Sequence, residues 1–341
     1  MRVFRDGRRD APPALASYLA AVFLDHPWRD PELSSLVHVA PDGVVRGFIG
    51  LLPLRMVLHG RKLRGAVASS VMVEGGAGVD PLAGARLVRA FLQGPQDFSL
   101  GECALDVTRR MWLPLGARTL ALRSLSWMRI LRPAGFAADV AARRAPLLAP
   151  ARLLAAPLDR ALAPWRREPV AEPVGGAAVA PEELASIIPA AIERYALRPD
   201  FDLAALRWLL SHAARKERRG APVARVVTGR RGRPVGGWLG HLRLRGVLQV
   251  QQVFAPPCHA TAVLDDVLAE AWRSGAVAAC GPAQPELAAA LQLHGCFFRH
   301  AGFSLAHARD PALAAALEGP DAFLGGVAGE TWIGLSGSAL V

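Results

Sequence analysis

The chain has 341 residues, 52% of them hydrophobic and 20% charged, which excludes an intrinsically disordered protein and predicts one large domain or two of ordinary size. Its apolar runs, such as 14–24, are shorter than the roughly 20 residues of a membrane-spanning helix, and no signal peptide is recognised, so we expect a cytoplasmic protein. The formal net charge of +11 comes almost entirely from arginine, because only Lys62 and Lys216 are lysines, and it favours partners that carry phosphate or carboxylate groups.

The first half of the chain is predicted to begin with a helix and a hairpin and then to alternate strands with helices. The turn Pro41-Asp42-Gly43 lies between two apolar runs and is typical of a hairpin. In chain order the expected elements are helix 12–24, strands 35–40, 44–53, 55–59 and 66–73, helix 83–92, strand 98–105, helix 107–115 and strand 119–127.

Residues 134–181 differ in composition, with Ala, Pro, Leu and Arg dominating, and are predicted to form a linker with one or two short helices. Within it, 143–167 places leucines among arginines, which suits a domain interface or, as the alternative, contact with a membrane surface. The second half then repeats the order of the first. Its expected elements are helix 203–215, strands 223–229, 234–244 and 247–254, helix 261–274, strand 276–280, helix 284–294, strand 296–303, helix 311–317 and strand 322–335.

The segment from Ser69 to Gln96 is the most informative part of the chain. An apolar strand enters a turn containing Gly75, Gly76 and Gly78, and an amphipathic helix follows. Such a turn directs free backbone N–H groups and a helix N-terminus at one point, which suits an anion and typically a phosphate. The alternative is an ordinary strand-to-helix connection with flexible glycines.

The two halves share the order hairpin, strand, loop, helix, strand, helix, glycine, strand. This order is carried by GFIGLLPLRMVLHGRKLRGAVASSVMVE (47–74), GARLVRAFL (84–92), RRMWLPLGA (109–117), GGWLGHLRLRGVLQVQQVF (236–254), LDDVLAEAWRSGAVAACG (264–281) and LAAALQLHGCFFR (287–299). It resembles the GNAT (Gcn5-related N-acetyltransferase) superfamily, and the whole chain is similar to a tandem pair of such folds.

The resemblance implies an α/β (α+β) fold with two GNAT-like domains, each a mixed, mostly antiparallel central sheet flanked by helices. We expect an N-terminal GNAT-like domain at 1–135, a Pro/Ala/Arg-rich linker at 136–181 and a C-terminal GNAT-like domain at 182–341.

The resemblance also implies acyl-CoA, such as acetyl-CoA, as co-substrate, and no metal. In the family the loop after the fourth strand typically reads R/Q-x-x-G-x-G/A, and its amides hold the pyrophosphate; here only Gly84 keeps a signature position. The loop of the second half, 255–259, does not match, so we expect the co-substrate in the first half alone. The residues implied to bind it are Val71, Met72, Val73, Gly78, Val79, Leu82, Ala83, Gly84 and Ala85.

Acyl transfer of this type needs a base for the acceptor and an acid for the leaving thiolate. Glu74, at the end of the strand that enters the glycine turn, is the leading candidate base, and a solvated carboxylate is the alternative. His59 is a further candidate base, and a residue of a surface turn is its alternative. Asp106 is another candidate, with a helix cap as its alternative, and Glu102 could share its catalytic role. The helix 107–115, where the family places a tyrosine acid, contains none.

Two further sets of residues are expected to be structural. The aspartates Asp265 and Asp266 are predicted to be solvated or to favour the helix dipole. The cysteines have no metal-binding spacing and are predicted to be buried thiols: Cys103, Cys258, Cys280 and Cys296.

These features favour an N-acyltransferase that moves an acyl group from a CoA or carrier-protein thioester to an amine or hydroxyl of a small-molecule or carrier-bound acceptor. An acyl-carrier protein is then a partner class. The alternatives are a Fem-like aminoacyl-tRNA-dependent transferase and a non-catalytic GNAT-fold binding protein. No basic segment rich in aromatic residues stands out, so nucleic acid is not expected as a partner.

Overall fold

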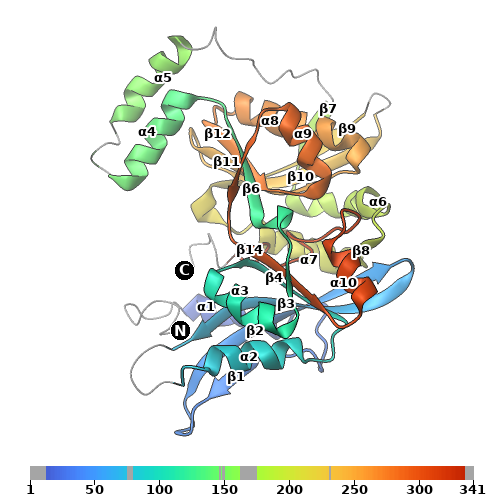
Figure 1. Ribbon diagram of the computed structural model, residues 1–341. Helices are drawn as coiled ribbons and strands as arrows, with labels where there is room; N and C mark the ends of the chain where they lie inside the picture. The colour runs from blue at the N-terminus through green and yellow to red at the C-terminus, as the bar shows by residue number, and fades with distance from the viewer. Residues whose placement is uncertain are drawn as a thin grey trace.

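The computed structural model describes residues 13–74, 80–145, 147, 150–161, 175–229 and 232–334. These residues form two lobes, each built on a seven-stranded sheet with helices packed against it (Figure 1). The expected α/β class with two mixed, mostly antiparallel sheets is confirmed.

The first sheet has the order β1-β2-β3-β4-β14-β5, with β8 paired to β2 beyond this path, and only β3 and β4 run parallel. Helices α2 and α3 cover one face, and α1, α7 and α10 lie on the other. The strands are β1 (Leu36–Val39), β2 (Val45–Leu58), β3 (Arg61–Val73), β4 (Phe98–Ala104), β5 (Arg118–Thr119), β8 (Leu197–Pro199) and β14 (Phe303–Ala308). The helices are α1 (Pro13–Phe23), α2 (Ala83–Leu92), α3 (Asp106–Trp112), α6 (Ile188–Ile192), α7 (Leu203–Ala213) and α10 (Pro311–Glu318).

The second sheet has the order β13-β6-β12-β11-β10-β9-β7, and here only β11 and β12 run parallel. Helices α8 (Ala260–Arg273) and α9 (Ala288–Leu293) pack their apolar sides on one face of it. The strands are β6 (Leu125–Ile130), β7 (Gly175–Val179), β9 (Ala221–Thr228), β10 (Pro234–Leu242), β11 (Val247–Phe254), β12 (Ala278–Pro282) and β13 (Phe297–His300).

The two lobes exchange strands. β14, from the second half of the chain, lies between β4 and β5 of the first sheet, and β6, from the first half, lies between β13 and β12 of the second. One hydrophobic cluster also joins the lobes, since it contains Leu54 and Phe98 together with Leu239 and Phe254. The domain boundaries at 135 and 182 stay a prediction, and each sheet takes a strand from beyond them.

The expected linker contains two helices, α4 (Pro133–Arg144) and α5 (Ala151–Ala161), which pack against each other at one side of the molecule (Figure 1). The carboxylate of Asp159 accepts hydrogen bonds from the first-turn N–H groups of Ala134 and Gly135. On α5, Leu154 and Leu158 are exposed, at 74% and 55%. Contact with a membrane surface stays a prediction. Among the described helices, none combines the length and the apolar character needed to cross a bilayer.

Several expected strands differ from the structure. The runs 44–53 and 55–59 form the single strand β2, and the run 296–303 covers β13 but only the first residue of β14. The run 119–127 divides into β5, a short 3₁₀ turn (Leu122–Ser124) and β6. The run 322–335, as far as it is described, consists of turns and isolated bridges because Gly325 and Gly326 both adopt positive φ, at 87° and 61°. Its apolar residues are buried without forming a strand, so their alternation does not identify the backbone conformation.

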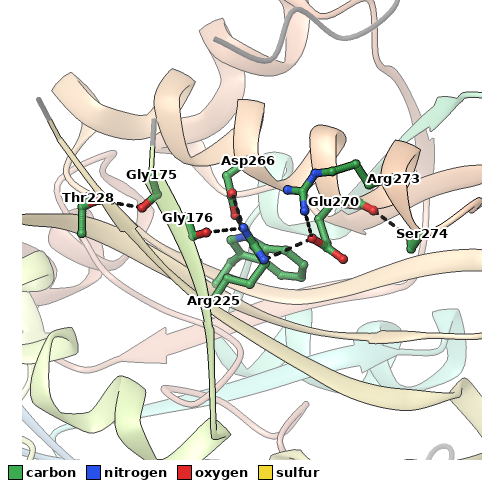
Figure 2. A network of polar contacts seen from close by, with 9 residues as sticks. Gly175, Gly176, Arg225, Thr228, Asp266, Glu270, Arg273 and Ser274 are labelled. Carbon is green, nitrogen blue, oxygen red and sulfur yellow. Dashed lines mark hydrogen bonds and ion pairs between the residues drawn. The ribbon is translucent and has the colours of Figure 1, made fainter. Parts of the chain in front are cut away.

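Asp266 is not solvated, contrary to the expectation from the sequence. On α8 its carboxylate accepts two hydrogen bonds from the Arg225 guanidinium, at 2.8 and 3.0 Å, and one from the Trp238 indole at 2.8 Å. Figure 2 shows Arg225 also reaching Glu270 and the carbonyl oxygen of Gly176. This network holds α8 and β7 against the second sheet.

Candidate functional site

The parallel strands β3 and β4 diverge halfway along their length. They pair from Gly65 with Phe98 to Ala68 with Gly101, and then continue to Val73 and Ala104 without further pairing to each other. The side of β3 that follows Ala68 therefore faces an opening instead of a neighbouring strand. The backbone groups there can pair with an extended ligand.

Two β-bulges face each other at the point of divergence. In β3, Ser70 and Val71 lie opposite a single residue of β2, and in β4, Glu102 and Cys103 lie opposite a single residue of β14. Ser70 and Cys103 both have positive φ, at 53° and 50°, which is uncommon for residues with a side chain. Bulges and positive φ values of this kind cluster at functional sites because they re-aim side chains.

The opening between the strands is a cleft of about 160 Å³, which we call the strand cleft. It is lined by both bulges, by Thr108 and Trp112 of α3, and by Glu330 from the chain's last described segment. Glu330 thus reaches the divergence from a segment more than two hundred residues distant from β4.

Glu102 holds this last segment in place. Its Oε2 accepts hydrogen bonds from the N–H groups of Glu330 and Thr331, at 2.6 and 3.2 Å. A Cβ built on Gly329 would lie 2.0 Å from the same oxygen, so only glycine fits at that position. Glu102 therefore acts as a backbone acceptor that fixes the Glu330 main chain beside the strand cleft.

The Glu330 carboxyl group has a pKa shifted from its ordinary value toward neutral pH. Burial, followed by the neighbouring Glu102 charge, raises the pKa of Glu330 to about 8, while a hydrogen bond from Ser69 opposes the shift. Burial likewise raises the pKa of Glu102, and two nearby carboxyl groups titrate as a coupled pair. Fully buried Lys216, whose ammonium donates to the Thr331 carbonyl, has its pKa lowered to about 7 by burial and by Arg219.

A second cavity, of about 500 Å³, meets the strand cleft at Glu102 and Cys103, which line both. We call it the inter-lobe cavity, because residues of α4 and of the second sheet form its other walls. Two hollows that share a wall beside a titratable carboxyl group can bring two reactants together, one from each side.

The three candidate catalytic residues of the sequence lie apart from this junction. Glu74 is paired with Arg46 at 3.0 Å, and its own N–H donates to the Arg46 carbonyl. His59 lies in the turn between β2 and β3, at the far end of β3 from Glu74, with φ of 49°. Asp106 begins α3 and pairs with arginines of the same helix, whose hydrogen bonds hold the pKa of Asp106 below its usual value. Their catalytic roles stay predictions.

The candidate co-substrate residues divide between β3 and the start of α2. Val71 lines the strand cleft, whereas Met72 lines a separate apolar pocket on the α1 side. Leu82 precedes α2 and is 56% exposed, and its N–H is capped by the carboxylate of Asp80. Val73 packs at the edge of the α2 core, and Ala83, Gly84 and Ala85 form the first turn of α2; Gly78 and Val79 lie outside the described residues.

The equivalent divergence in the second lobe is closed by a side chain. β11 and β12 pair only from Val247 to Gln249, and beyond this the Gln284 carboxamide accepts from the N–H of Val253 and donates to its carbonyl, both at 2.9 Å. Gln284 therefore occupies the strand edge that an extended ligand would need. This contact supports the expectation that only the first half holds the co-substrate.

Replacing Gln284 by alanine is expected to lower the free energy of unfolding by about 1–3 kcal/mol, because both backbone groups of Val253 are left buried without partners. Urea denaturation followed by circular dichroism measures this loss. The matched control is Gln292→Ala on the exposed side of α9, which should change stability by less than about 0.5 kcal/mol. Equal effects of the two variants would contradict the structural role of Gln284.

Glu330 was not found from the sequence, because 322–335 was predicted as a strand and its acidic residue was not singled out. The only signal was a carboxylate within an apolar, glycine-containing run. Neither tyrosine of the chain lines the strand cleft or the inter-lobe cavity: the hydroxyl of Tyr18 accepts from Gly334 N–H, and that of Tyr195 donates to Ala255.

All four cysteines are free, and the prediction of buried thiols is wrong for two of them, since Cys103 and Cys258 are exposed. Cys103 is exposed as a residue, but the protein atoms around its thiol desolvate the sulfur. This desolvation and the charges of Glu102 and Glu330 raise the thiol pKa to about 12, so the sulfur stays protonated and is a weak nucleophile. Within the described part of the chain, no group of three or more His, Cys, Asp or Glu residues is arranged to hold a metal.

No known protein-family model matches the sequence. Nor does any curated protein match it.

Solved structures do match the fold. A conserved protein of unknown function and probable N-acyltransferase from Enterococcus faecalis V583 has a TM-score of 0.53 at 10% identity, covering 87% of this chain and 66% of that one. A GCN5-related N-acetyltransferase from Anabaena variabilis ATCC 29413 has a TM-score of 0.53 at 12% identity, covering 86% and 66%. A GCN5-related N-acetyltransferase from Kribbella flavida has a TM-score of 0.48 at 15% identity, covering 82% of this chain and 61% of that one. This chain therefore has the GNAT fold, and it spans less than two thirds of the length of one of these proteins and about two thirds of the other two.

Proposed function

We propose that the protein is an acyltransferase that moves an acyl group from a CoA or carrier-protein thioester onto the amine or hydroxyl group of an acceptor. The observation that carries the proposal is the strand cleft: parallel strands diverge at facing bulges, and the resulting opening meets a second cavity beside Glu330. The GNAT fold of the chain supports the same reaction class.

The residues present fit an acyl thioester in the strand cleft. The side of β3 beyond Ala68 offers backbone groups at an unpaired edge, with which the amides of an extended pantetheine chain can pair. At the start of α2, Asp80 is paired with Arg86 at 3.0 Å, which balances the carboxylate near the expected phosphate position. A carrier protein delivers the same pantetheine chemistry, so both donor classes suit this cleft.

Glu330 is the proposed base. A bound thioester supplies the acyl group and a thiolate leaving group. The Glu330 carboxylate accepts the proton that the acceptor nitrogen or oxygen loses as its bond to the acyl carbon forms, and the carbon–sulfur bond breaks. The carboxyl group then returns the proton to the thiolate, so Glu330 serves first as the base and then as the acid. Glu102, held by backbone N–H groups, positions the Glu330 main chain.

Binding of CoA tests the donor site directly. At 100 times its Kd, CoA is expected to stabilise the folded protein by about 2.7 kcal/mol and to raise Tm by about 3–5 °C. Differential scanning fluorimetry with CoA, acetyl-CoA and longer acyl-CoA measures the shift, and ADP at the same concentration is the control for the nucleotide alone. If none of these thioesters or CoA raises Tm, the donor assignment is contradicted. Salt-dependent binding of tRNA would instead favour an aminoacyl-tRNA-dependent transferase.

A further inference from the structure

The inter-lobe cavity lies on the face of the second sheet that α8 and α9 leave uncovered. Ser126 and Met128 of β6 and Cys280 of β12 face it, whereas Trp127 between them packs into the core beneath α8. Helix α4 closes the far side with Phe136, which packs on this same face of the sheet. The cavity is therefore a walled hollow between sheet and helix, of a volume that suits a small ligand.

Its lining carries more positive than negative charge. Of the described side chains that line it, four are arginines (Arg123, Arg143, Arg219 and Arg299) and two are carboxylates (Glu102 and Asp139). The two carboxylates are occupied by protein groups, since Glu102 binds backbone N–H groups and Asp139 pairs with Arg143 and with Arg243. Four arginines against two carboxylates give the lining of the cavity a formal net positive charge.

Arg299 is the arginine that a ligand can recruit. It projects from β13 opposite Ser126 of β6, so both side chains lie on the cavity face. Among the described residues it forms no hydrogen bond or ion pair, in contrast to Arg123, which donates to the carbonyls of Leu324 and Ala322. Arg299 is an exposed residue of β13 that lines the cavity, and a guanidinium without a protein partner there can bind a carboxylate or phosphate through two parallel hydrogen bonds.

Two buried polar atoms in the same cavity also have no partner among the described residues. They are the hydroxyl of Ser126, a residue 9% exposed, and Oε1 of Gln251, a residue 5% exposed. Gln251 is the extra residue of the β11 bulge, and its amide nitrogen donates to Thr331, beside Glu330. Buried polar atoms are nearly always satisfied in native proteins, so these two are expected to bind an ordered water or a polar group of a ligand in the cavity.

We propose that the inter-lobe cavity binds an acceptor whose anionic group, a carboxylate or a phosphate, is held by Arg299 and its neighbouring arginines. This inference rests on the proposed function and adds the substrate class of the same site. The anion lies at the Arg299 end of the cavity, with Ser126 beside it, and the nucleophile of the acceptor reaches the junction with the strand cleft at Glu102 and Cys103. A short amine with an anionic group can place its anion at the Arg299 end of the cavity and its amine at the junction with the strand cleft.

The test compares amines that carry an anionic group with counterparts that have a neutral group in its place, and these counterparts are called uncharged with reference to that position alone. The probes are O-phosphoethanolamine with ethanolamine, and β-alanine with β-alaninamide, titrated by isothermal calorimetry without a donor and then assayed as acceptors with acetyl-CoA. We expect the anionic member of one pair to bind, and Arg299→Ala to weaken that binding about 10- to 100-fold without changing the response to the uncharged member. The pair that responds distinguishes phosphate from carboxylate.

The matched control is Arg129→Ala, which removes the same charge from β6. Arg129 points away from the cavity, to the other side of the sheet from Ser126 and Met128, and donates to the Gly295 carbonyl. Equal loss of binding in both variants, or equal affinity for anionic and uncharged probes, would overturn the proposal. If anion binding depends on Arg299 but no CoA thioester stabilises the protein, the acyl-transfer function is refuted and the anion site remains. If the protein acylates uncharged amines alone, the anion site is refuted and the acyl-transfer function remains.

Discussion

Replacing Glu330 by glutamine is expected to lower kcat for acyl transfer by about 100- to 10,000-fold, the usual contribution of a positioned general base. The amide keeps the size of the side chain and its place beside Ser69, but it has no basic oxygen to accept the acceptor's proton. Steady-state kinetics with acetyl-CoA and an acceptor measure the loss. CoA binding, followed by the thermal shift, is expected to be retained.

The pH dependence of the same variant separates catalysis from folding. Because the carboxylate form accepts the proton, kcat/KM of the natural protein should rise with pH up to about 8, and the variant should lose this limb. The folded-state pKa of Glu330 lies above the ordinary value of 4.5, so its contribution to stability is present below 4.5 and is lost as the pH rises through about 8. Glu330→Gln stays neutral, and its Tm at pH 9 should therefore equal or exceed that of the natural protein, with Glu102 and Lys216 unchanged beside it.

Glu74→Gln is the matched control for this experiment. Glu74 lies at the end of β3 and forms an ion pair with Arg46, away from the lining of both cavities. If Glu330 is the base, Glu74→Gln retains nearly all activity. If Glu74→Gln abolishes turnover and Glu330→Gln does not, the sequence-based choice is restored and the role of Glu330 is refuted.

Replacing Asp266 by alanine is expected to cost about 3–5 kcal/mol of unfolding free energy, the largest effect on stability that we expect in the chain. The substitution leaves the Arg225 guanidinium, whose side chain is only 8% exposed, with Glu270 and one carbonyl as partners, and it removes the acceptor of the Trp238 indole (Figure 2). Thermal and urea unfolding of the purified variant measure the cost.

The adjacent Asp265 provides the control. Its carboxylate is 27% exposed and pairs with His294 at 2.9 Å on the surface of the second lobe, so Asp265→Ala should cost less than about 1 kcal/mol. A cost for Asp266→Ala no greater than that of its neighbour would show that the buried network is not stabilising.

The sequence was sufficient for the fold class and for most elements, because those depend on local patterns. The spacing of apolar residues located α2 and α7, and the Pro-Asp-Gly turn located the hairpin of β1 and β2. The pattern failed at 322–335. The apolar residues there are buried in a chain of turns, which Gly325 and Gly326 make possible by adopting positive φ, and they do not form a strand. Burial alone does not distinguish these two arrangements.

The site was less accessible from the sequence, since its parts meet only through long-range packing. Strand divergence near Ala68 depends on two bulges in different strands, and no local signal marks either bulge. Glu330 joins Glu102 through hydrogen bonds to backbone groups across 228 positions of the chain. Asp265 and Asp266 are adjacent and chemically identical, yet Asp266 is buried and Asp265 is partly exposed, because their places on α8 differ by one step.

The exchange of β6 and β14 determines when each lobe can be completed during synthesis. β4 and β5 flank a position that stays empty until residues 303–308 have been synthesised, and β6, which ends at residue 130, has no partner strand until β12 and β13 follow. Contacts that span so much of the chain close slowly, because their loop entropy is lost before the contacts form. Neither half, expressed alone, carries a full set of strands, so the two lobes must finish folding together.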